Sequence, residues 1–172
     1  MSSATTPAGK PPPTTRHGAE ETLLSITIST TAEIDAPKQS GWDVLTDISA
    51  YHEWNPYMEI EGALRVGTKL TVRMGADRGR GMVFKPAVLA ATPGEELRWL
   101  GKLGPGGIVD GEHFFILKSN ADGSTHLTNG ERYSGVLVAL AKPFLNKERN
   151  QAGYGGFNQV LKRRAESLRE DE

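Results

Sequence analysis

A histidine and a glutamate on two neighbouring predicted strands are the residues best placed for chemistry. The dipeptide Asp122-Gly123 separates two runs of alternating apolar residues, which is typical of a hairpin turn. Pairing Leu117 with Leu127 across this turn sets His113 opposite Glu131. Alternate residues of a strand share one face, so all four side chains lie on the face that the leucines assign to the core. We expect His113 and Glu131 to be neighbours on the concave face of a sheet, with about 5 Å between their Cβ atoms.

Three roles are open to this pair. A histidine beside a carboxylate in an apolar cavity can transfer protons, because imidazole titrates near neutral pH. The two side chains can also anchor the polar group of a ligand, or form a structural ion pair or hydrogen bond. Contact with the carboxylate favours the imidazolium form of His113, and burial opposes it. The same register places Phe115 opposite Asn129 and continues the face at Tyr133.

Other chemistries are excluded or lack a motif. The chain has no cysteine, which rules out disulfides, thiolate nucleophiles and cysteine-bound zinc. The remaining histidines, His17, His52 and His126, are not spaced with one another or with carboxylates as metal ligands are. The glycines at 104, 106 and 107 precede no Lys-Ser/Thr pair, so they indicate a turn and not a phosphate loop. We therefore expect no metal site and no cofactor.

The charge balance bears on the class of partner. The formal net charge of the 172-residue chain is −1, so no bulk field attracts nucleic acid or an anionic membrane. No apolar run approaches the ~20 residues that a membrane helix needs, and the N-terminus lacks the apolar block of a secretory signal. We expect no nucleic-acid partner, no stable membrane insertion and a cytoplasmic location, while the oligomeric state stays open.

The elements that position the pair follow from periodicity. Residues 1–20 are rich in Pro, Thr and Ser, so we predict a disordered N-terminal tail followed by one domain over residues 21–172. The predicted elements are a strand at 22–34, helices at 37–48 and 50–54, strands at 57–60, 67–74, 82–91, 96–101, 111–118 and 125–133, and a long helix that begins at 136 or 143 and ends at 169. Asp35 is a candidate cap for the first helix.

This order predicts an α+β fold. A curved antiparallel sheet of about seven strands surrounds a long C-terminal helix, and two short helices follow the first strand. A strongly twisted sheet and a straight helix do not touch everywhere, so the gap between them is a natural cavity.

The last helix contains an unexpected cluster of glycines, Gly153-Tyr154-Gly155-Gly156. Each interior glycine costs about 1 kcal/mol relative to alanine in a helix. Gly153 precedes Phe157 by four residues, so both lie on the stripe that faces the sheet. Either the missing side chains widen the cavity beside a ligand, or the helix kinks or breaks there.

Several segments occur together in an order and spacing typical of one family. Ile34-Asp35-Ala36-Pro37 precedes a helix that contains Trp42-Asp43-Val44-Leu45, and Tyr51-His52-Glu53-Trp54-Asn55-Pro56 follows. Further matches are Gly67-Thr68-Lys69-Leu70, Pro93-Gly94-Glu95-Glu96-Leu97-Arg98-Trp99, Gly111-Glu112-His113-Phe114-Phe115-Ile116-Leu117 and Gly135. Over roughly residues 24–168 the chain resembles the SRPBCC superfamily, which includes START-like lipid-transfer domains, birch-pollen-allergen-like proteins and polyketide cyclases. The resemblance implies the helix-grip fold.

The resemblance does not imply one activity, because the superfamily contains lipid carriers, hormone receptors, aromatase/cyclases and chaperone activators. We expect binding of a hydrophobic, aromatic or polycyclic, small molecule in the internal cavity. One alternative is a polyketide cyclase/dehydratase-like enzyme that uses the same cavity, with His113 and Glu131 as candidate catalytic residues. Another is a protein-interaction or accessory module such as a chaperone activator.

The expected ligand-binding residues come from the strands, the long helix and one loop. Trp54-Asn55-Pro56 is similar to the family's segment at the cavity entrance, although a packed tryptophan that closes the short helix is the alternative. Trp99 and Phe84 are expected to face the cavity from neighbouring strands, with a core position as the alternative. The full set is Trp54, Asn55, Phe84, Trp99, His113, Phe115, Glu131, Tyr133, Gly153 and Phe157.

Overall fold

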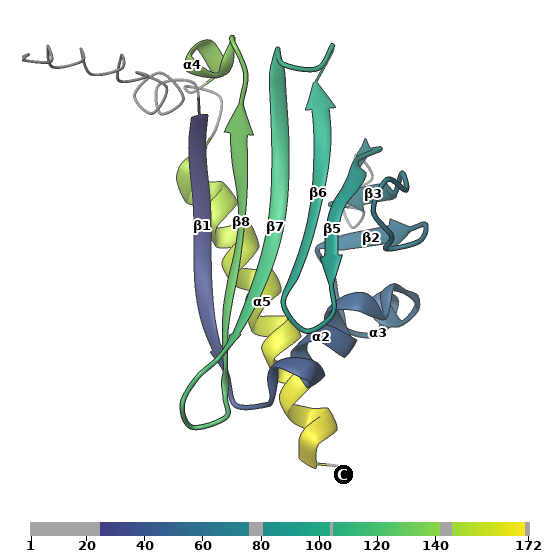
Figure 1. Ribbon diagram of the computed structural model, residues 1–172, viewed down its shortest axis with the longest axis vertical. Helices are drawn as coiled ribbons and strands as arrows, with labels where there is room; N and C mark the ends of the chain where they lie inside the picture. Colours follow the sequence, from purple (N-terminus) through teal and green to yellow (C-terminus); the bar gives the residue numbers. More distant parts are fainter. Residues whose placement is uncertain (1–24, 76–80, 104, 142–145, 171–172) are drawn as a thin grey trace, which may run out of the picture.

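The computed structural model describes residues 25–75, 81–103, 105–141 and 146–170. Residues 1–20, for which the sequence predicts a disordered tail, lie outside the described residues, as does the alternative helix start at 143. The α+β prediction is confirmed, because an antiparallel sheet curves around a long C-terminal helix (Figure 1).

The large sheet has five strands, which pair antiparallel in the order β1-β8-β7-β6-β5. Their bounds are β1 Ser25–Ile34, β5 Ala87–Thr92, β6 Glu96–Leu103, β7 Val109–Ser119 and β8 Thr125–Ser134. The predicted turn at Asp122-Gly123 forms between β7 and β8, and Gly123 adopts a φ of 87° that favours glycine. This turn sets Leu117 opposite Leu127, as the sequence predicts.

A second sheet of three strands lies beside β5 (Figure 1) and consists of β2 Met58–Glu61, β3 Thr71–Met74 and β4 Met82–Phe84. The sequence predicts about seven strands in one sheet and a single strand over 82–91. Instead, Pro86 separates β4 from β5, because proline lacks the N–H that a central strand needs. The N–H of Leu70 donates to the Pro86 carbonyl at 2.8 Å, and the N–H of Val88 donates to the Thr68 carbonyl at 2.9 Å. These bonds connect the two sheets.

The long helix α5, Lys147–Glu170, crosses the five-stranded sheet diagonally (Figure 1). The two predicted short helices are α2, Lys38–Thr46, and α3, Tyr51–Trp54, which a 3₁₀ turn at Ile48–Ala50 connects. A further short helix, α4 at Val138–Ala141, follows β8. No helix in these described segments is long and apolar enough to cross a membrane.

The glycine cluster does not break α5, which continues without interruption from Lys147 to Glu170. A β-carbon at Gly156 would overlap the ring of Tyr57, so this glycine allows the loop before β2 to approach the helix closely. A β-carbon at Gly153 or Gly155 would meet nothing within 4 Å. Close packing against Tyr57 therefore explains one of the three glycines.

The hydrophobic core lies between α5 and the face of the large sheet that α5 covers. The ring centroids of Phe115 and Phe157 are 5.3 Å apart, and those of Phe157 and Trp54 are 5.7 Å apart. The largest fully buried side chains are Ile28, Ile34, Leu45, Tyr51, Leu70, Val88, Leu97, Phe115, Leu127, Val138, Phe157 and Leu161. Side chains from both ends of the chain therefore share one core.

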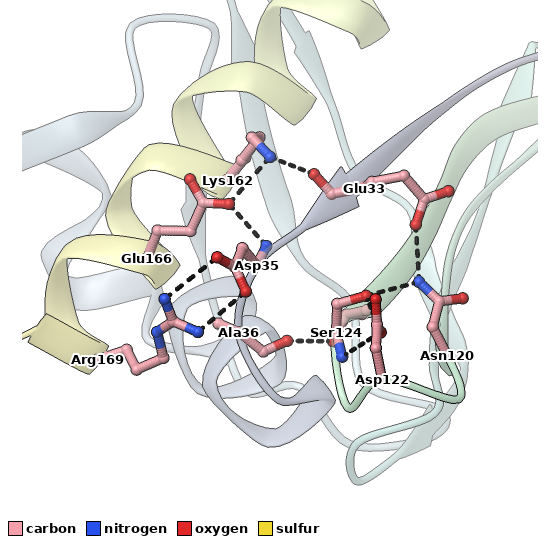
Figure 2. Close-up of polar contacts among 10 residues, drawn as sticks. Glu33, Asp35, Ala36, Asn120, Asp122, Ser124, Lys162, Glu166 and Arg169 are labelled. Atoms are coloured by element: carbon pink, nitrogen blue, oxygen red, sulfur yellow. Dashed lines mark hydrogen bonds and ion pairs between the residues drawn. The ribbon is translucent and has the colours of Figure 1, made fainter.

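Ion pairs fasten the C-terminal end of α5 to the corner between β1 and α2 (Figure 2). The Arg169 guanidinium donates to both carboxylate oxygens of Asp35, at 2.9 and 3.2 Å. The carboxylate of Glu166 accepts the backbone N–H of Asp35 at 2.6 Å and pairs with Lys162 at 2.9 Å. The expected cap at Asp35 is wrong, because α2 begins after Pro37 without a side-chain cap and the Asp35 carboxylate pairs with α5 instead.

The core assignment predicts that Phe157→Ala lowers the free energy of unfolding by about 3–5 kcal/mol, because the ring is 1% exposed and its removal leaves a cavity. Urea unfolding followed by circular dichroism measures this change. The matched control is Leu168→Ala on the same helix, where the side chain is 41% exposed and the expected change is within about 0.5 kcal/mol. Equal losses in the two variants would contradict the assignment.

Candidate ligand cavity

The cavity best suited to a ligand has a volume of about 80 Å³ and lies between the large sheet and the small one. Strands β6, β7 and β8 form one wall, and β2, β3 and β4 form the other. Among the described residues its lining consists of Met58, Val72, Met74, Phe84, Pro86, Trp99, Gly101, Gly111, His113 and Glu131.

Two paired glycines create this space. Gly101 on β6 is the register partner of Gly111 on β7, and Gly111 is the partner of Tyr133 on β8. The next row on the same face contains Trp99, His113 and Glu131. Alternate residues of a strand share a face, so both rows point toward the small sheet. Because Gly101 and Gly111 have no side chains, their row is lower than the neighbouring row of Trp99 and His113. The cavity therefore follows from residue size at two positions in register.

The cavity does not lie in the gap between sheet and helix, where the sequence places it. Phe115 and Phe157, which the sequence assigns to the ligand site, are 0% and 1% exposed and pack against each other. Leu161 of α5 is also fully buried there. These large side chains fill the described part of the gap, and the cavity lies beside the two glycines instead.

Glu131 is the polar centre of the cavity wall. Its Oε2 atom accepts hydrogen bonds from the hydroxyls of Tyr133 and Tyr154, each at 2.9 Å. Tyr133 lies two residues along the same strand, and Tyr154 reaches the carboxylate from α5. Strand β8 and the long helix thus both supply a hydrogen-bond donor to this carboxylate.

Both tyrosines remain neutral donors. Burial, reinforced by the negative charge of Glu131, raises the pKa of Tyr133 and that of Tyr154 well above the ordinary value of 10.0. Phenolate formation beside the carboxylate would place two negative charges in a poorly solvated space. The hydroxyls therefore donate to Glu131 throughout the physiological pH range.

His113 is buried in an aromatic stack. Its ring lies parallel to that of Trp99, with centroids 5.1 Å apart and an angle of 10° between the planes. The rings of Phe115 and Tyr154 meet it edge-on at 4.8 and 5.4 Å. Burial lowers the pKa of His113 below its ordinary value of 6.5, and the opposing effects of Glu131 and Asn129 do not compensate. The imidazole is therefore neutral at pH 7.

The structure confirms that His113 and Glu131 are register partners on the concave face. The side chains do not form a hydrogen bond with each other, because Glu131 is directed to the tyrosines. The Nε2 atom of His113 and the Oδ1 atom of Asn129 are buried without a hydrogen-bond partner among the described residues. The amide of Asn129 lies close enough to raise the pKa of His113, yet no hydrogen bond of normal geometry joins them.

A buried polar chain holds α5 against the sheet. The amide of Asn129 on β8 donates to Oδ1 of Asn158 on α5 at 2.9 Å, and the amide of Asn158 donates to the Thr30 hydroxyl on β1 at 3.1 Å. Both asparagines are 0% exposed. Because Asn158 lies one helical turn after Tyr154, these hydrogen bonds also help to position the Tyr154 side chain.

Sequence reasoning missed Tyr154, although the flanking glycines marked the segment. The signal that could have indicated Tyr154 is its spacing from Asn158. The two residues are four positions apart, so they lie on the same stripe of the helix. Gly101 was also missed, and its pairing with Gly111 could have been read by extending the register of the predicted strands.

The other predicted site residues lie at the cavity, at a separate groove, or at neither. Trp99 and Phe84 line the cavity between the two sheets, whereas the sequence places them at a cavity beside the helix, and Tyr133 and Gly153 are not among the lining residues. Trp54 and Asn55 line an open groove of about 540 Å³ between α3, β2 and α5. Asn55 accepts the backbone N–H groups of Tyr57 and Met58 at 2.9 and 3.3 Å, so its side chain also stabilises the turn before β2.

Met58 separates the two spaces. Its side chain lines both the cavity and the groove, and it is 6% exposed. Methionine has three rotatable bonds and adapts its shape readily. A change of its rotamer would connect the cavity with the groove at Trp54.

The described residues contain no group of three or more His, Asp or Glu side chains that could hold a metal ion. The acidic residue of the cavity stands with one histidine and two tyrosines, and this set lacks the several carboxylate or imidazole ligands that divalent metals need. The chemistry open to the site is hydrogen bonding and proton transfer.

The chain belongs to the family described as polyketide cyclase/dehydrase and lipid transport, whose model matches residues 25–170. This match confirms the resemblance to the SRPBCC superfamily and supports the binding of a hydrophobic ligand. No curated protein matches the sequence.

Solved structures show the same fold at low sequence identity. The di-domain ARO/CYC BexL from the BE-7585A biosynthetic pathway matches with a TM-score of 0.61 and 13% identity, over 88% of this chain and 53% of BexL. Protein NE0264 from Nitrosomonas europaea matches with a TM-score of 0.63 and 16% identity, over 86% of this chain and 97% of that protein. Ara h 8.0201 matches with a TM-score of 0.56 and 13% identity, over 83% of this chain and 99% of that protein. The chain thus spans about half the length of BexL.

The burial of His113 predicts an acid-side loss of stability. Well above pH 6.5 the ring of His113 is neutral in both the folded and the unfolded chain and adds no pH dependence. As the pH falls below 6.5 the unfolded chain binds the proton first, so stability falls until the pH reaches the lowered pKa of the folded state. Urea unfolding from pH 7.5 to about 5 should therefore show a smaller loss for His113→Phe than for the wild type. An equal loss in both would contradict the neutral, buried imidazole.

Proposed function

We propose that this protein binds a small apolar molecule carrying an aromatic ring in the cavity between the two sheets. The observation that carries the proposal is the paired absence of side chains at Gly101 and Gly111. Larger residues at these two positions would add van der Waals contacts to the core. The glycines forgo these contacts and border a space lined by Trp99 and Phe84. Ligand pockets are mostly apolar with few polar groups, which is the composition of this lining.

The size of the cavity limits the ligand. Its volume of about 80 Å³ is smaller than the roughly 150 Å³ that accommodates benzene in an engineered protein core. Met58 and Met74 on the opposite wall are flexible, and Phe84 at the rim is exposed, so these three side chains can give way to one ring. A polycyclic ligand would in addition need Met58 to move toward the groove at Trp54.

Glu131 orients the ligand in this proposal. Tyr133 and Tyr154 hold the carboxylate in place, so its position does not depend on the ligand. A fixed acceptor beside an apolar space selects a ligand with a donor at a matching distance from its ring. His113 contributes the flat floor through its stack with Trp99.

The second candidate is a cyclase or dehydratase that uses the same cavity. The observation that favours it is a carboxylate hydrogen-bonded to two neutral tyrosines beside an apolar space, which is a set of groups that can accept and donate protons. The family description includes such enzymes. In an enzyme of this kind, Glu131→Gln would lower kcat by about 100-fold or more with a modest change in KM, whereas a pure binding protein shows no turnover in either form.

The binding proposal predicts that Gly101→Ala weakens ligand binding without loss of stability. A β-carbon at Gly101 would contact only the Gly111 carbonyl, at 3.8 Å, so the methyl group enters the cavity and disturbs nothing else. Titration of ¹⁵N-labelled protein with benzyl alcohol should show saturable shifts of cavity amides in the wild type and at least tenfold weaker binding in the variant. The matched control is Gly155→Ala, whose β-carbon meets nothing within 4 Å and whose affinity should equal that of the wild type. Equal affinity in Gly101→Ala would contradict this location.

A further inference from the structure

We propose that the ligand carries a protonated nitrogen that pairs with Glu131, and that the cavity rejects ligands with a carboxylate. This inference rests on the proposed binding function and adds the charge of the ligand to it. It follows from the charges of the wall, from the free oxygen of Glu131 and from the water that a ligand must displace.

Glu131 forms no ion pair with any residue that the structure describes. Among the described residues of the cavity lining, Glu131 alone carries a formal charge at pH 7, because His113 is neutral. Three other half-buried carboxylates are ion-paired, Glu96 and Glu112 with Arg98, at 2.7 and 2.8 Å, and Glu166 with Lys162 at 2.9 Å, whereas Asp110 accepts the backbone N–H of Gly107 at 2.9 Å. Glu131 receives only neutral donors in this part of the chain. The wall therefore presents an unbalanced negative charge.

The second oxygen of Glu131 is the one that a ligand meets. Both tyrosine hydroxyls bind Oε2, which leaves Oε1 without a hydrogen bond from the described residues. A β-carbon at Gly111 would overlap Oε1, so this oxygen occupies the space that the glycine leaves open at the cavity wall. Gly111 thus makes room for a carboxylate oxygen at the cavity wall, and Gly101 leaves the space beside it open.

The displaced water decides which ligand fits. A ring that enters the cavity removes water from Oε1, and a charged acceptor left without a donor is strongly destabilised. A hydroxyl restores one neutral hydrogen bond, whereas an ammonium group restores a charge-assisted bond of about twice the strength. The faces of Trp99 and Phe84 add to this preference, since aromatic faces attract cations.

The same wall disfavours anions. A carboxylate that entered would meet Glu131 with no lysine or arginine of the described lining to offset the repulsion. The cavity should therefore discriminate by charge between ligands of one shape, with the cation bound best and the anion worst.

Three single-ring probes test this inference: benzylamine, which is protonated at pH 7, neutral benzyl alcohol and anionic benzoate. Affinities at fixed ionic strength come from amide shifts of the wild type, Glu131→Gln and Glu148→Gln. The last variant makes the same charge change at an exposed position of α5 away from the cavity. We expect the wild type and Glu148→Gln to bind benzylamine at least fivefold more tightly than benzyl alcohol, and benzoate most weakly. In Glu131→Gln the three affinities should converge while benzyl alcohol still binds.

The outcomes separate this inference from the function on which it rests. Equal binding of benzylamine and benzyl alcohol by the wild type overturns the inference and leaves the apolar-ligand proposal standing. A preference for benzylamine that persists in Glu131→Gln overturns the assignment to this carboxylate. If none of the three probes shifts the cavity amides, the proposed function fails and the inference fails with it.

Discussion

The antiparallel register of β7 and β8 is the constraint on which the rest of the site depends. The tight turn at Asp122-Gly123 sets this register, and a shift by one residue would move every side chain of one strand to the opposite face. The observed pairing gives the concave face an apolar row at Leu117 and Leu127, and a polar row at His113 and Glu131. The fold thereby separates a packed region from one that can admit a ligand.

The position of α5 is the second condition. Asn158 forms buried hydrogen bonds to β8 and to β1, and these bonds constrain the depth and rotation of the helix against the sheet. That placement brings Tyr154 to Glu131, where it shares one carboxylate oxygen with Tyr133. The other oxygen remains available beside Gly111. A structural contact between helix and sheet thus determines which part of the carboxylate faces the cavity.

The sequence predicted the features that local rules control. Alternation and turn chemistry gave β7, β8 and the His113–Glu131 pairing, because a short hairpin leaves few possible registers. The location of the cavity was not predictable in this way, since it depends on how Phe115 and Phe157 fill the space under α5 and on a second sheet that forms after Pro86. The partners of Glu131 were missed for a similar reason. Tyr154 is 23 residues away along the chain, and no periodicity reports a contact between helix and strand at that distance.

The central claim is that the ligand lies between the two sheets and not between the large sheet and α5. Nuclear Overhauser effects from the ring protons of bound benzyl alcohol to methyl-labelled protein measure this location directly. The account predicts contacts to the methyl groups of Met58 and Met74, which line the cavity, and none to those of Leu161 in the core under α5. Contacts to Leu161 without contacts to either methionine would contradict it.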